Sequence, residues 1–302
     1  MSETIIVPDS ADKLRLDTYL AKKYVDISRA AWQKLIKQGD ILLNKKKVAP
    51  HKSLKAGHII TISEIPDNNA YLKPTDKISF KVIDEDDDFL IIEKPAGLLS
   101  HPDSRLQSDT LVNQLIKYYP PIAAVGEDSL RPGLVHRLDQ DVSGVMVIAK
   151  TTEAYHHLKK LFRLRQIKKE YLAVVYEEPS NNSGTINFSI SRSRHHPHRM
   201  AARPDASGRQ AETEYFVLKN ENHRSLLRVL TKTGRTHQVR VHLFALGHPI
   251  VGDRLYHPKK KTRQLPDRLM LHAVKLAFTD LKNKSRVYHC PPPPPSSQWL
   301  NP

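Results

Sequence analysis

A short polar loop followed by a fully apolar run constrains this chain more than any other stretch. Residues 136–144 read His-Arg-Leu-Asp-Gln-Asp-Val-Ser-Gly, and residues 145–149 read Val-Met-Val-Ile-Ala. Five apolar residues between polar segments are typical of a buried strand, and the Ser-Gly pair before them is predicted to form a tight turn. The loop carries Asp139 two residues after Arg137. Catalytic groups often lie on loops that a rigid sheet holds, so Asp139 is the first candidate for chemistry.

Further short motifs stand on either side of this loop. They comprise residues 88–97 with His101-Pro102, 166–173, 233–242, 247–253 with Tyr256, and 269–273. Together with the Asp139 loop, and in the same order, they resemble the motifs of the RluA family of pseudouridine synthases, with the nearest resemblance to the RluC/RluD branch. One position departs from the family pattern, because the threonine before the Ser-Gly pair is Val142 here.

The resemblance implies an α+β pseudouridine synthase fold, with a mixed, mostly antiparallel sheet and flanking helices. It also implies an isomerase without a cofactor, which detaches uracil from ribose at nitrogen and rejoins it through carbon. Such a reaction needs one ionised carboxylate, which the resemblance assigns to Asp139, with Arg240 as counter-ion and Tyr171 stacked on the target base. Tyr171 is also a candidate for the final proton removal. Arg137 is the second candidate for the counter-ion, although its motif favours displacing or holding RNA. Leu271 is expected to pack below the base.

Basic residues outside this catalytic set are expected to contact RNA. The target uridine must leave its stack to reach the site, which costs less in a loop or bulge than in a duplex. Arg235 and His237 are candidates for this contact, and the Pro-broken segment 192–199, with three Arg and three His, is a candidate clamp. The clustered histidines also suggest a metal site, but their spacing lacks a Cys or carboxylate pattern, so we expect no metal.

Residues 14–62 are predicted to form a small α+β module of two helices and short strands. Leu16, Tyr19, Leu20 and Tyr24 recur at helical spacing. A second helix is expected after the N-cap Ser28, with Ile27 and Trp32 as a hydrophobic staple and Gly39 past its end. The expected strands are 41–43, 47–49 and 58–62, with turns at 44–45 and 56–57.

This module resembles an S-four-like RNA-binding domain. The matching residues are Arg15-Leu16-Asp17, Ser28-Arg29, Leu35-Ile36, Gly39 and Leu43-Asn44. The glycine that usually follows the asparagine is Lys45 here, which suggests a longer hairpin. Residues 1–65 carry twelve Lys or Arg against seven Asp or Glu, a net charge of +5. Arg29, Lys34 and Lys37 are the candidates for phosphate contacts, although for any single lysine a solvated helix face is the competing interpretation.

The charge of the whole chain favours a polyanionic partner. The net charge is +16 over 302 residues, and nucleic acid leads because phosphates reward clustered Lys and Arg through counterion release. An acidic membrane surface is the alternative, but no apolar run approaches the ~18 residues of a span and no basic amphipathic helix or lipidation motif is clear. The single cysteine, Cys290, and the lack of a secretory leader favour a cytoplasmic protein, which we expect to be a monomer.

The predicted organisation has four parts. They are an RNA-binding module at 1–65, a linker at 66–77, a catalytic domain at 78–290 and a Pro-rich tail at 291–302. Within the catalytic domain, helices are expected at 110–118 and 152–164, and strands at 171–176, 185–190, 211–218 and 225–230, a mixture typical of an α+β domain.

The sequence therefore predicts an RNA pseudouridine synthase whose substrate is structured large-subunit ribosomal RNA. Transfer RNA is the alternative substrate. A catalytically silent RNA-binding protein that assists ribosome assembly is the alternative from another class. The presence of Asp139, Tyr171 and Arg240 together favours the enzyme.

Overall fold

The computed structural model describes residues 3–24, 27, 29–64, 72–102, 109–196, 198–257 and 268–293. The chain divides into two compact units, one of residues 1–78 with 101–132 and the other of residues 79–100 with 133–302. The predicted N-cap Ser28, the first half of the predicted linker and most of the predicted tail lie outside the described residues. Within these ranges no helix has the length and apolar character needed to cross a bilayer.

The first unit begins with two helices and a three-stranded antiparallel sheet. Its elements are β1 (Glu3–Ile6), the 3-10 helix η1 (Asp9–Ala11), α1 (Leu16–Lys23), α2 (Arg29–Gln38), β2 (Ile41–Leu43) and β3 (Ile59–Ile62). The sheet order is β1-β3-β2, and the sequence pattern does not predict β1. Leu16, Leu20, Trp32 and Ile36 are buried in one apolar core with Ile60 of the sheet, which confirms both predicted helices.

Two predictions for this region are wrong, both at the turn after β2. Asn44 and Lys45 have φ of 49° and 61°, and the main chains of Leu43 and Lys46 bond each other across them. This is a two-residue turn with both φ positive, because Lys45 itself adopts the left-handed conformation, so the hairpin is not longer. Residues 47–49 form no strand. The strand that pairs with β2 is β3 instead, and Asn44 extends this pairing through main-chain and side-chain hydrogen bonds to Ile59.

The predicted helix end at Gly39 is confirmed. Gly39 has φ of +92°, and the amide of Asp40 donates to the carbonyl of Leu35 at 3.1 Å. This bond across a left-handed glycine closes the last turn of α2 and satisfies a carbonyl that the helix leaves unpaired.

Helix α3 (Leu111–Tyr118) and the 3-10 helix η3 (Pro120–Ala124) also belong to the first unit. At the start of α3 the amide of Thr110 donates to Asn113 Oδ1, and Asn113 Nδ2 donates to the carbonyl of Lys73 at 2.8 Å. The predicted helix at 110–118 is thus confirmed, and a buried asparagine ties it to the segment before β4.

The second unit is built on one large mixed sheet. Nine strands of its described residues pair in the order β4-β5-β6-β13-β7-β12-β11-β8, with β14 beside β13. Their bounds are β4 (Lys81–Glu85), β5 (Phe89–Lys94), β6 (Ser143–Ala149), β7 (Lys168–Tyr176), β8 (Ser183–Ile186), β11 (Thr213–Glu221), β12 (Arg224–Thr231), β13 (Leu271–Thr279) and β14 (Ser285–His289). Only β6 and β13 run parallel among these described pairs. The predicted α+β class is confirmed.

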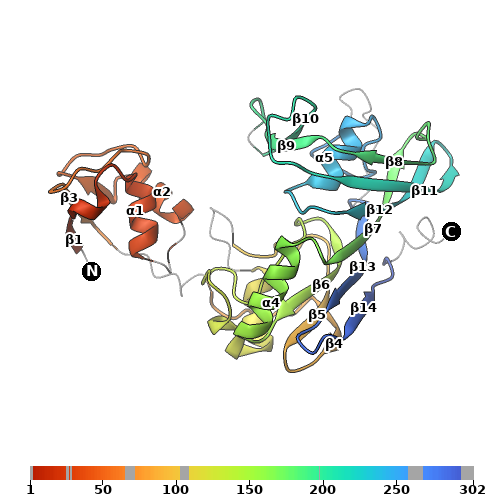
Figure 1. The fold of residues 1–302 in the computed structure, drawn as a ribbon, viewed down its shortest axis with the longest axis horizontal. Coiled ribbons are helices and arrows are strands. Elements are labelled where there is room, and N and C mark those ends of the chain that lie inside the picture. Colours follow the sequence, from red (N-terminus) through yellow and green to blue (C-terminus); the bar gives the residue numbers. More distant parts are fainter. Residues whose placement is uncertain are drawn as a thin grey trace. The chain divides into compact units, whose positions relative to one another are not determined.

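Helices and a small second sheet flank the large one. They are α4 (Thr152–Arg163), which packs on β6, α5 (Gln238–Ala245), which packs near β10 and β11, and the antiparallel pair β9 (Ser189–Arg192) and β10 (Met200–Arg203) (Figure 1). Thr151 caps α4 by accepting the amide of Ala154. The predicted helix at 152–164 and the predicted strands within β7, β11 and β12 are confirmed.

The strand after the Asp139 loop is the most buried of the large sheet. All seven residues of β6 are buried, as the apolar run predicts. The predicted Ser-Gly turn is wrong, because Ser143 and Gly144 are the first residues of β6 and pair with His272 and Ala273. A Cβ on Gly144 would lie 2.3 Å from the carbonyl oxygen of Ala273, so only glycine permits this approach.

The predicted strand at 185–190 is wrong as one element. The chain leaves the large sheet after Ile186 and enters the small sheet at Ser189. Between them the carbonyl of Phe188 accepts a hydrogen bond from His242 Nε2 of α5 at 2.9 Å. The alternating pattern of residues 185–190 continues across this bond, so the pattern alone hides the change of sheet.

A buried histidine joins β6 to β13 and predicts acid sensitivity. His272 is fully buried, its Nδ1 accepts from Ser143 Oγ at 2.7 Å, and its Nε2 donates to the carbonyl of Cys290 at 3.0 Å. Burial lowers the pKa of His272 to about 4. In the unfolded chain the histidine pKa is near 6.5. Between pH 6.5 and 4 the unfolded state therefore binds more protons than the folded state, and the free energy of unfolding falls as pH falls.

We therefore expect His272 to account for about 2 kcal/mol of the stability lost between pH 7 and pH 5. The measurement is denaturant unfolding of wild type and His272→Gln at both pH values. The variant should be less stable at pH 7 but should lose less on acidification. An identical loss in the two proteins would contradict the assignment.

Candidate active site

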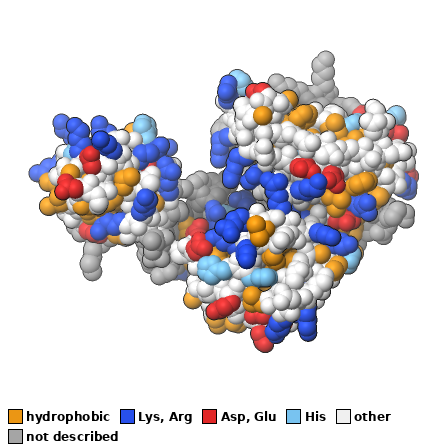
Figure 2. All heavy atoms as spheres, viewed as in Figure 1, with side chains coloured by type: hydrophobic (Ala, Val, Ile, Leu, Met, Phe, Trp, Pro, Cys, Tyr) orange, Lys and Arg blue, Asp and Glu red, His pale blue; other side chains and the backbone are white. Residues whose placement is uncertain are grey.

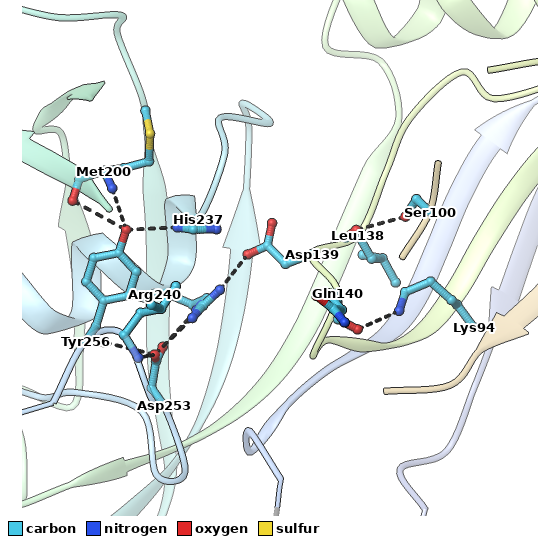
Figure 3. Close-up of polar contacts among 11 residues, drawn as sticks. Lys94, Ser100, Leu138, Asp139, Gln140, Met200, His237, Arg240, Asp253 and Tyr256 are labelled. Carbon is cyan, nitrogen blue, oxygen red and sulfur yellow. Dashed lines mark hydrogen bonds and ion pairs between the residues drawn. The ribbon is translucent and has the colours of Figure 1, made fainter. Parts of the chain in front are cut away.

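The Asp139 loop is fixed by its main chain on both sides of the carboxylate. The carbonyl of Leu138 accepts from Ser100 Oγ at 2.9 Å, and the carbonyl of Gln140 accepts from Lys94 Nζ at 3.0 Å (Figure 3). The amide of Val142 donates to the carbonyl of Asp139 at 3.2 Å. Asp139 therefore projects from a short loop whose neighbouring carbonyls are all held.

Lys94, at the end of β5, clamps this loop. Its side chain is fully buried, and Nζ donates to the carbonyls of Pro95 at 2.8 Å, Leu98 at 2.7 Å and Gln140 at 3.0 Å. Burial lowers the pKa of Lys94 to about 7, while the charge of Asp139 opposes that shift. Three acceptors match the three protons of an ammonium group, so Lys94 joins the turn after β5 to the catalytic loop.

Val142, which replaces the threonine of the family pattern, still closes the turn of the Asp139 loop. Val142 is 3% exposed, and its bond to Asp139 comes from the main-chain amide, which every residue except proline supplies. The loss of a threonine hydroxyl therefore removes no bond that this turn uses.

Arg240 of α5 joins two carboxylates. Its Nη1 donates to Asp139 Oδ2 at 3.2 Å, while Nε and Nη2 donate to Oδ2 and Oδ1 of Asp253 at 2.7 and 2.9 Å (Figure 3). Asp253 is 1% exposed and also accepts the amides of Leu255 and Tyr256. Burial acts against the charge of Arg240, but the bonds and charge of Asp253, with the charge of Asp139, raise its pKa above the usual value.

One of the two candidate counter-ions forms an ion pair with Asp139. The side chain of Arg240 is 4% exposed and is held by Asp253, so it presents a fixed donor to Asp139. Arg137 is an exposed residue that lines the same cavity. The position of Arg240 thus fits the expected counter-ion, and that of Arg137 fits its other expected role, contact with RNA.

Tyr171 and Leu271 line one cavity with Asp139. The cavity has a volume of about 530 Å³, and all its lining residues belong to the second unit. Tyr171 lies on β7, and Leu271 is the first residue of β13 and 3% exposed. Burial, followed by the charge of Asp139, raises the pKa of Tyr171 to about 12. The phenol is therefore neutral at pH 7.

Cations dominate the wall of this cavity. Its only acidic lining residue among those described is Asp139, against seven Lys or Arg: Arg137, Arg163, Arg165, Lys169, Lys232, Arg235 and Arg240. Figure 2 shows Lys and Arg side chains gathered around the hollow in the middle of this unit. Burial lowers the pKa of Lys169 to about 8. A small cavity with one carboxylate and many cations suits a nucleotide within a polyanionic chain.

Arg235 and His237 also line the cavity, as the sequence predicts for RNA contacts. Arg235 Nε donates to the carbonyl of Gln210 at 3.0 Å. His237 stands at the start of α5 with φ of 56°, and its Nδ1 lies 2.9 Å from Tyr256 Oη. Burial lowers the pKa of His237, which keeps the imidazole neutral at pH 7.

The remaining candidates, Arg29, Lys34 and Lys37, lie on α2 in the first unit. Arg29 donates through Nε and Nη2 to the buried Asp17 at 3.1 and 3.0 Å. These N–H groups stabilise the fold, so Arg29 has fewer donors for RNA. Lys34 and Lys37 are exposed, and Lys37 lines a surface hollow with Arg15.

Sequence patterns do not reveal several residues of the site. Asp253, Tyr256 and Lys94 stand in the motifs described above, but no pattern assigns them a role, and Ser100 lies outside those motifs. Asp253 is 13 residues from Arg240, and no helical or strand spacing connects them. The available signal is the donor set of arginine, because its five N–H groups exceed what one carboxylate accepts and a buried guanidinium needs further acceptors.

No group of three or more His, Cys, Asp or Glu side chains that could hold a metal ion is found in the described ranges. The basic segment at 192–199 begins at Arg192, the last residue of β9, and the rest of it leads to β10, apart from Pro197, which the structure does not describe. Its role as an RNA clamp stays a prediction.

Comparisons with known proteins identify the family of this chain. A family model for RNA pseudouridylate synthase matches residues 88–245, and an S4 domain model matches residues 14–60. An uncharacterized RNA pseudouridine synthase of Aquifex aeolicus is 35% identical over 309 residues, covering 99% of this chain and 92% of the relative. Ribosomal large subunit pseudouridine synthase D of Xylella fastidiosa is 40% identical over 256 residues, covering 84% and 75%.

Solved structures are similar as well. Human RNA Pseudouridylate Synthase Domain Containing 1 superposes with a TM-score of 0.60 at 27% identity, covering 74% of this chain and 87% of that one. The family model, the full-length relatives and the fold agree with the motifs. The chain therefore belongs to the RluA family of RNA pseudouridine synthases and carries an N-terminal S4 domain.

Proposed function

We propose that this enzyme isomerises specific uridines of large-subunit ribosomal RNA, with Asp139 as the reacting carboxylate. The observation that carries the proposal is that Asp139, the one carboxylate among the described lining residues, pairs with Arg240 in a cavity lined by seven Lys or Arg. Support for the substrate comes from relatives named ribosomal large subunit pseudouridine synthase D, such as that of Vibrio cholerae, which is 33% identical over 304 residues and covers 96% of this chain.

We assign the remaining roles from the same geometry. Arg240, anchored by Asp253, orients the Asp139 carboxylate through its hydrogen bond to Oδ2. Tyr171 stacks on the uracil, which suits a neutral ring in the wall of the cavity, and Leu271 packs below the base. In the free protein the raised pKa keeps Tyr171 protonated. For Tyr171 to act as the final base, binding of the RNA would have to lower this pKa. Arg137 contacts the RNA at the position in the base stack that the target uridine leaves.

The S4 domain indicates RNA binding, and we propose that it recognises structured ribosomal RNA. We also propose a cytoplasmic monomer. The one cysteine is buried and unpaired, which fits a reducing compartment.

The test is incubation of the purified protein with transcripts of large-subunit ribosomal RNA and of transfer RNA, followed by mapping of pseudouridine. We expect modification at discrete ribosomal positions and none in transfer RNA. Modification of transfer RNA alone would overturn the substrate assignment. Binding of both RNAs without modification of either would favour a silent RNA-binding protein.

The clamp at Lys94 gives a prediction on rate. Lys94→Met removes the donor to three carbonyls but also relieves the burial of a charge, so the two effects on stability oppose each other. The Asp139 loop should lose its fixed geometry, and misplacement by ~1 Å costs on the order of 100-fold in rate. Turnover at saturating RNA should fall steeply while RNA affinity is kept. Wild-type turnover would show that the clamp does not position the loop.

The exposed lysines of α2 give a prediction on binding. Replacing Lys34 and Lys37 together by Ala should weaken RNA affinity and lower the log–log salt slope by ~0.7–0.9 for each phosphate that the protein no longer neutralises. The matched control replaces Lys22 and Lys55, exposed lysines of the same unit outside α2. Titrations of a ribosomal RNA fragment at several salt concentrations provide the measurement. Equal slopes for the test variant and wild type would mean that this helix face is only solvated.

A further inference from the structure

We propose that His237 donates a hydrogen bond from Nε2 to a carbonyl oxygen of the target uracil, and that the hydroxyl of Tyr256 positions it. The inference rests on the proposed function of the cavity and adds a substrate contact to it. His237 would be a catalytic residue that touches the base, and Tyr256 a positioning residue that acts through it.

The first observation is the backbone of His237. Ten described non-glycine residues have positive φ, and nine of them are exposed, whereas His237 is half-buried in the wall of the cavity. A left-handed conformation disfavours a side chain by roughly 1–2 kcal/mol. Strain of this kind in a partly buried position, three residues before Arg240, points to a function for the side chain.

The second observation is the bond that orients the imidazole. Tyr256 is 2% exposed; its Oη accepts the amide of Met200 at 2.7 Å and lies 2.9 Å from His237 Nδ1 and 3.3 Å from the Met200 carbonyl (Figure 3). Burial raises the pKa of Tyr256 to about 12, so the hydroxyl keeps its proton. We assign the hydroxyl proton to the nearer acceptor, Nδ1 at 2.9 Å, rather than to the Met200 carbonyl at 3.3 Å, and with this assignment the neutral imidazole carries its own proton on Nε2.

The third observation is where this ring lies. In Figure 3 the imidazole lies between Tyr256 and Asp139, and it lines the cavity that Asp139 and Tyr171 share. The ring of Tyr256 also stacks under Arg240, with the guanidinium carbon 5.3 Å from its centroid. One phenol thus contacts both Arg240, which pairs with Asp139, and the imidazole in the wall of the same cavity.

The chemistry of uracil gives this donor a use. When the base detaches from ribose, the electron pair of the broken bond passes into the ring, and attack on the ring also pushes electrons toward its carbonyl oxygens. Negative charge therefore collects on those oxygens along either route. A preoriented donor at that position stabilises the transition state more than the resting substrate.

The test combines three variants in single-turnover assays at saturating RNA. Removing one donor of this type costs about 100-fold or more in rate, which we expect for His237→Ala. His237→Gln, which keeps a side-chain N–H, should recover part of the rate. Tyr256→Phe, which deletes only the hydroxyl, should lower the rate about tenfold, equivalent to one weakened hydrogen bond, without changing RNA affinity. Tyr288→Phe, which loses a hydroxyl bond to Asp84 in the β14 region, is the matched control and should react like wild type.

The decisive comparison is Tyr256→Phe in the His237→Ala background. If Tyr256 acts through His237, its hydroxyl should matter little once the imidazole is gone, and the added loss should be under about twofold, within ordinary non-additivity. A full tenfold loss in both backgrounds would make Tyr256 a structural residue and overturn its role. Wild-type rate in His237→Ala would overturn the proposal as a whole.

The proposed function fails in a different way. If wild type and Asp139→Asn both leave the RNA unmodified, or both modify it equally, the cavity is not the active site. An active wild type, an inactive Asp139→Asn and an unaffected His237→Ala would overturn the inference alone.

Discussion

Asp139→Asn is expected to abolish pseudouridine formation while the protein keeps its fold and its affinity for RNA. The substitution is nearly isosteric and removes the only negative charge among the described lining residues of the cavity. The amide oxygen can still accept from Arg240 Nη1, and the neighbouring carbonyls of Leu138 and Gln140 remain held by Ser100 and Lys94. Loss of a reacting group in such a unit typically costs on the order of 10⁴-fold or more in rate.

The assay is pseudouridine formation on a ribosomal RNA transcript, with thermal unfolding and RNA binding measured beside it. Asp141→Asn is the matched control, because Asp141 is an exposed carboxylate two residues further along the same loop. The control should retain most of the activity. A near wild-type rate in Asp139→Asn, or equal losses in the two variants, would remove Asp139 from the chemistry.

Arg240→Met should lose both activity and stability. Arg240 is the shared partner of two carboxylates, and Asp253 is almost completely buried. Removing one partner of a buried pair typically costs ~3–5 kcal/mol, because the remaining charge stays uncompensated. The Asp139 carboxylate loses its oriented counter-ion at the same time, so turnover should fall even at temperatures where the variant is folded.

Two measurements separate these effects. Denaturant unfolding gives the stability change, and single-turnover rates well below the melting temperature give the loss of chemistry. Arg240→Lys keeps the charge but lacks the fork that spans both carboxylates, so it should recover stability only in part and activity hardly at all. Unchanged unfolding and unchanged turnover in Arg240→Met would show that the ion pair has no role.

Local patterns predict most of the elements that hold the site. The apolar run at 145–149 lies in the buried β6, and the helix expected at 152–164 forms as α4. The pairing of Asp139 with Arg240 spans 101 residues, and no periodicity connects them. Only the resemblance of two distant motifs to one family predicts that contact, and the geometry agrees with it.

The remaining features depend on contacts that form only in the folded chain. Gly144 begins a strand because the backbone of Ala273 lies against it, although a Ser-Gly pair alone favours a turn. Lys94 reads as an ordinary charged strand end, yet three carbonyls surround its ammonium group. The role of Tyr256 depends on Met200 and His237, which lie 56 and 19 residues away.

The most direct test of the central claim maps pseudouridine at single-nucleotide resolution in large-subunit ribosomal RNA from cells that lack this gene. Cells complemented with the wild-type gene and with Asp139→Asn complete the comparison. We expect discrete positions to lose pseudouridine without the gene, to regain it with wild type, and to stay unmodified with the variant. The claim would be contradicted if deletion of the gene left the pseudouridine pattern unchanged. It would also be contradicted if Asp139→Asn restored the pattern as well as wild type does.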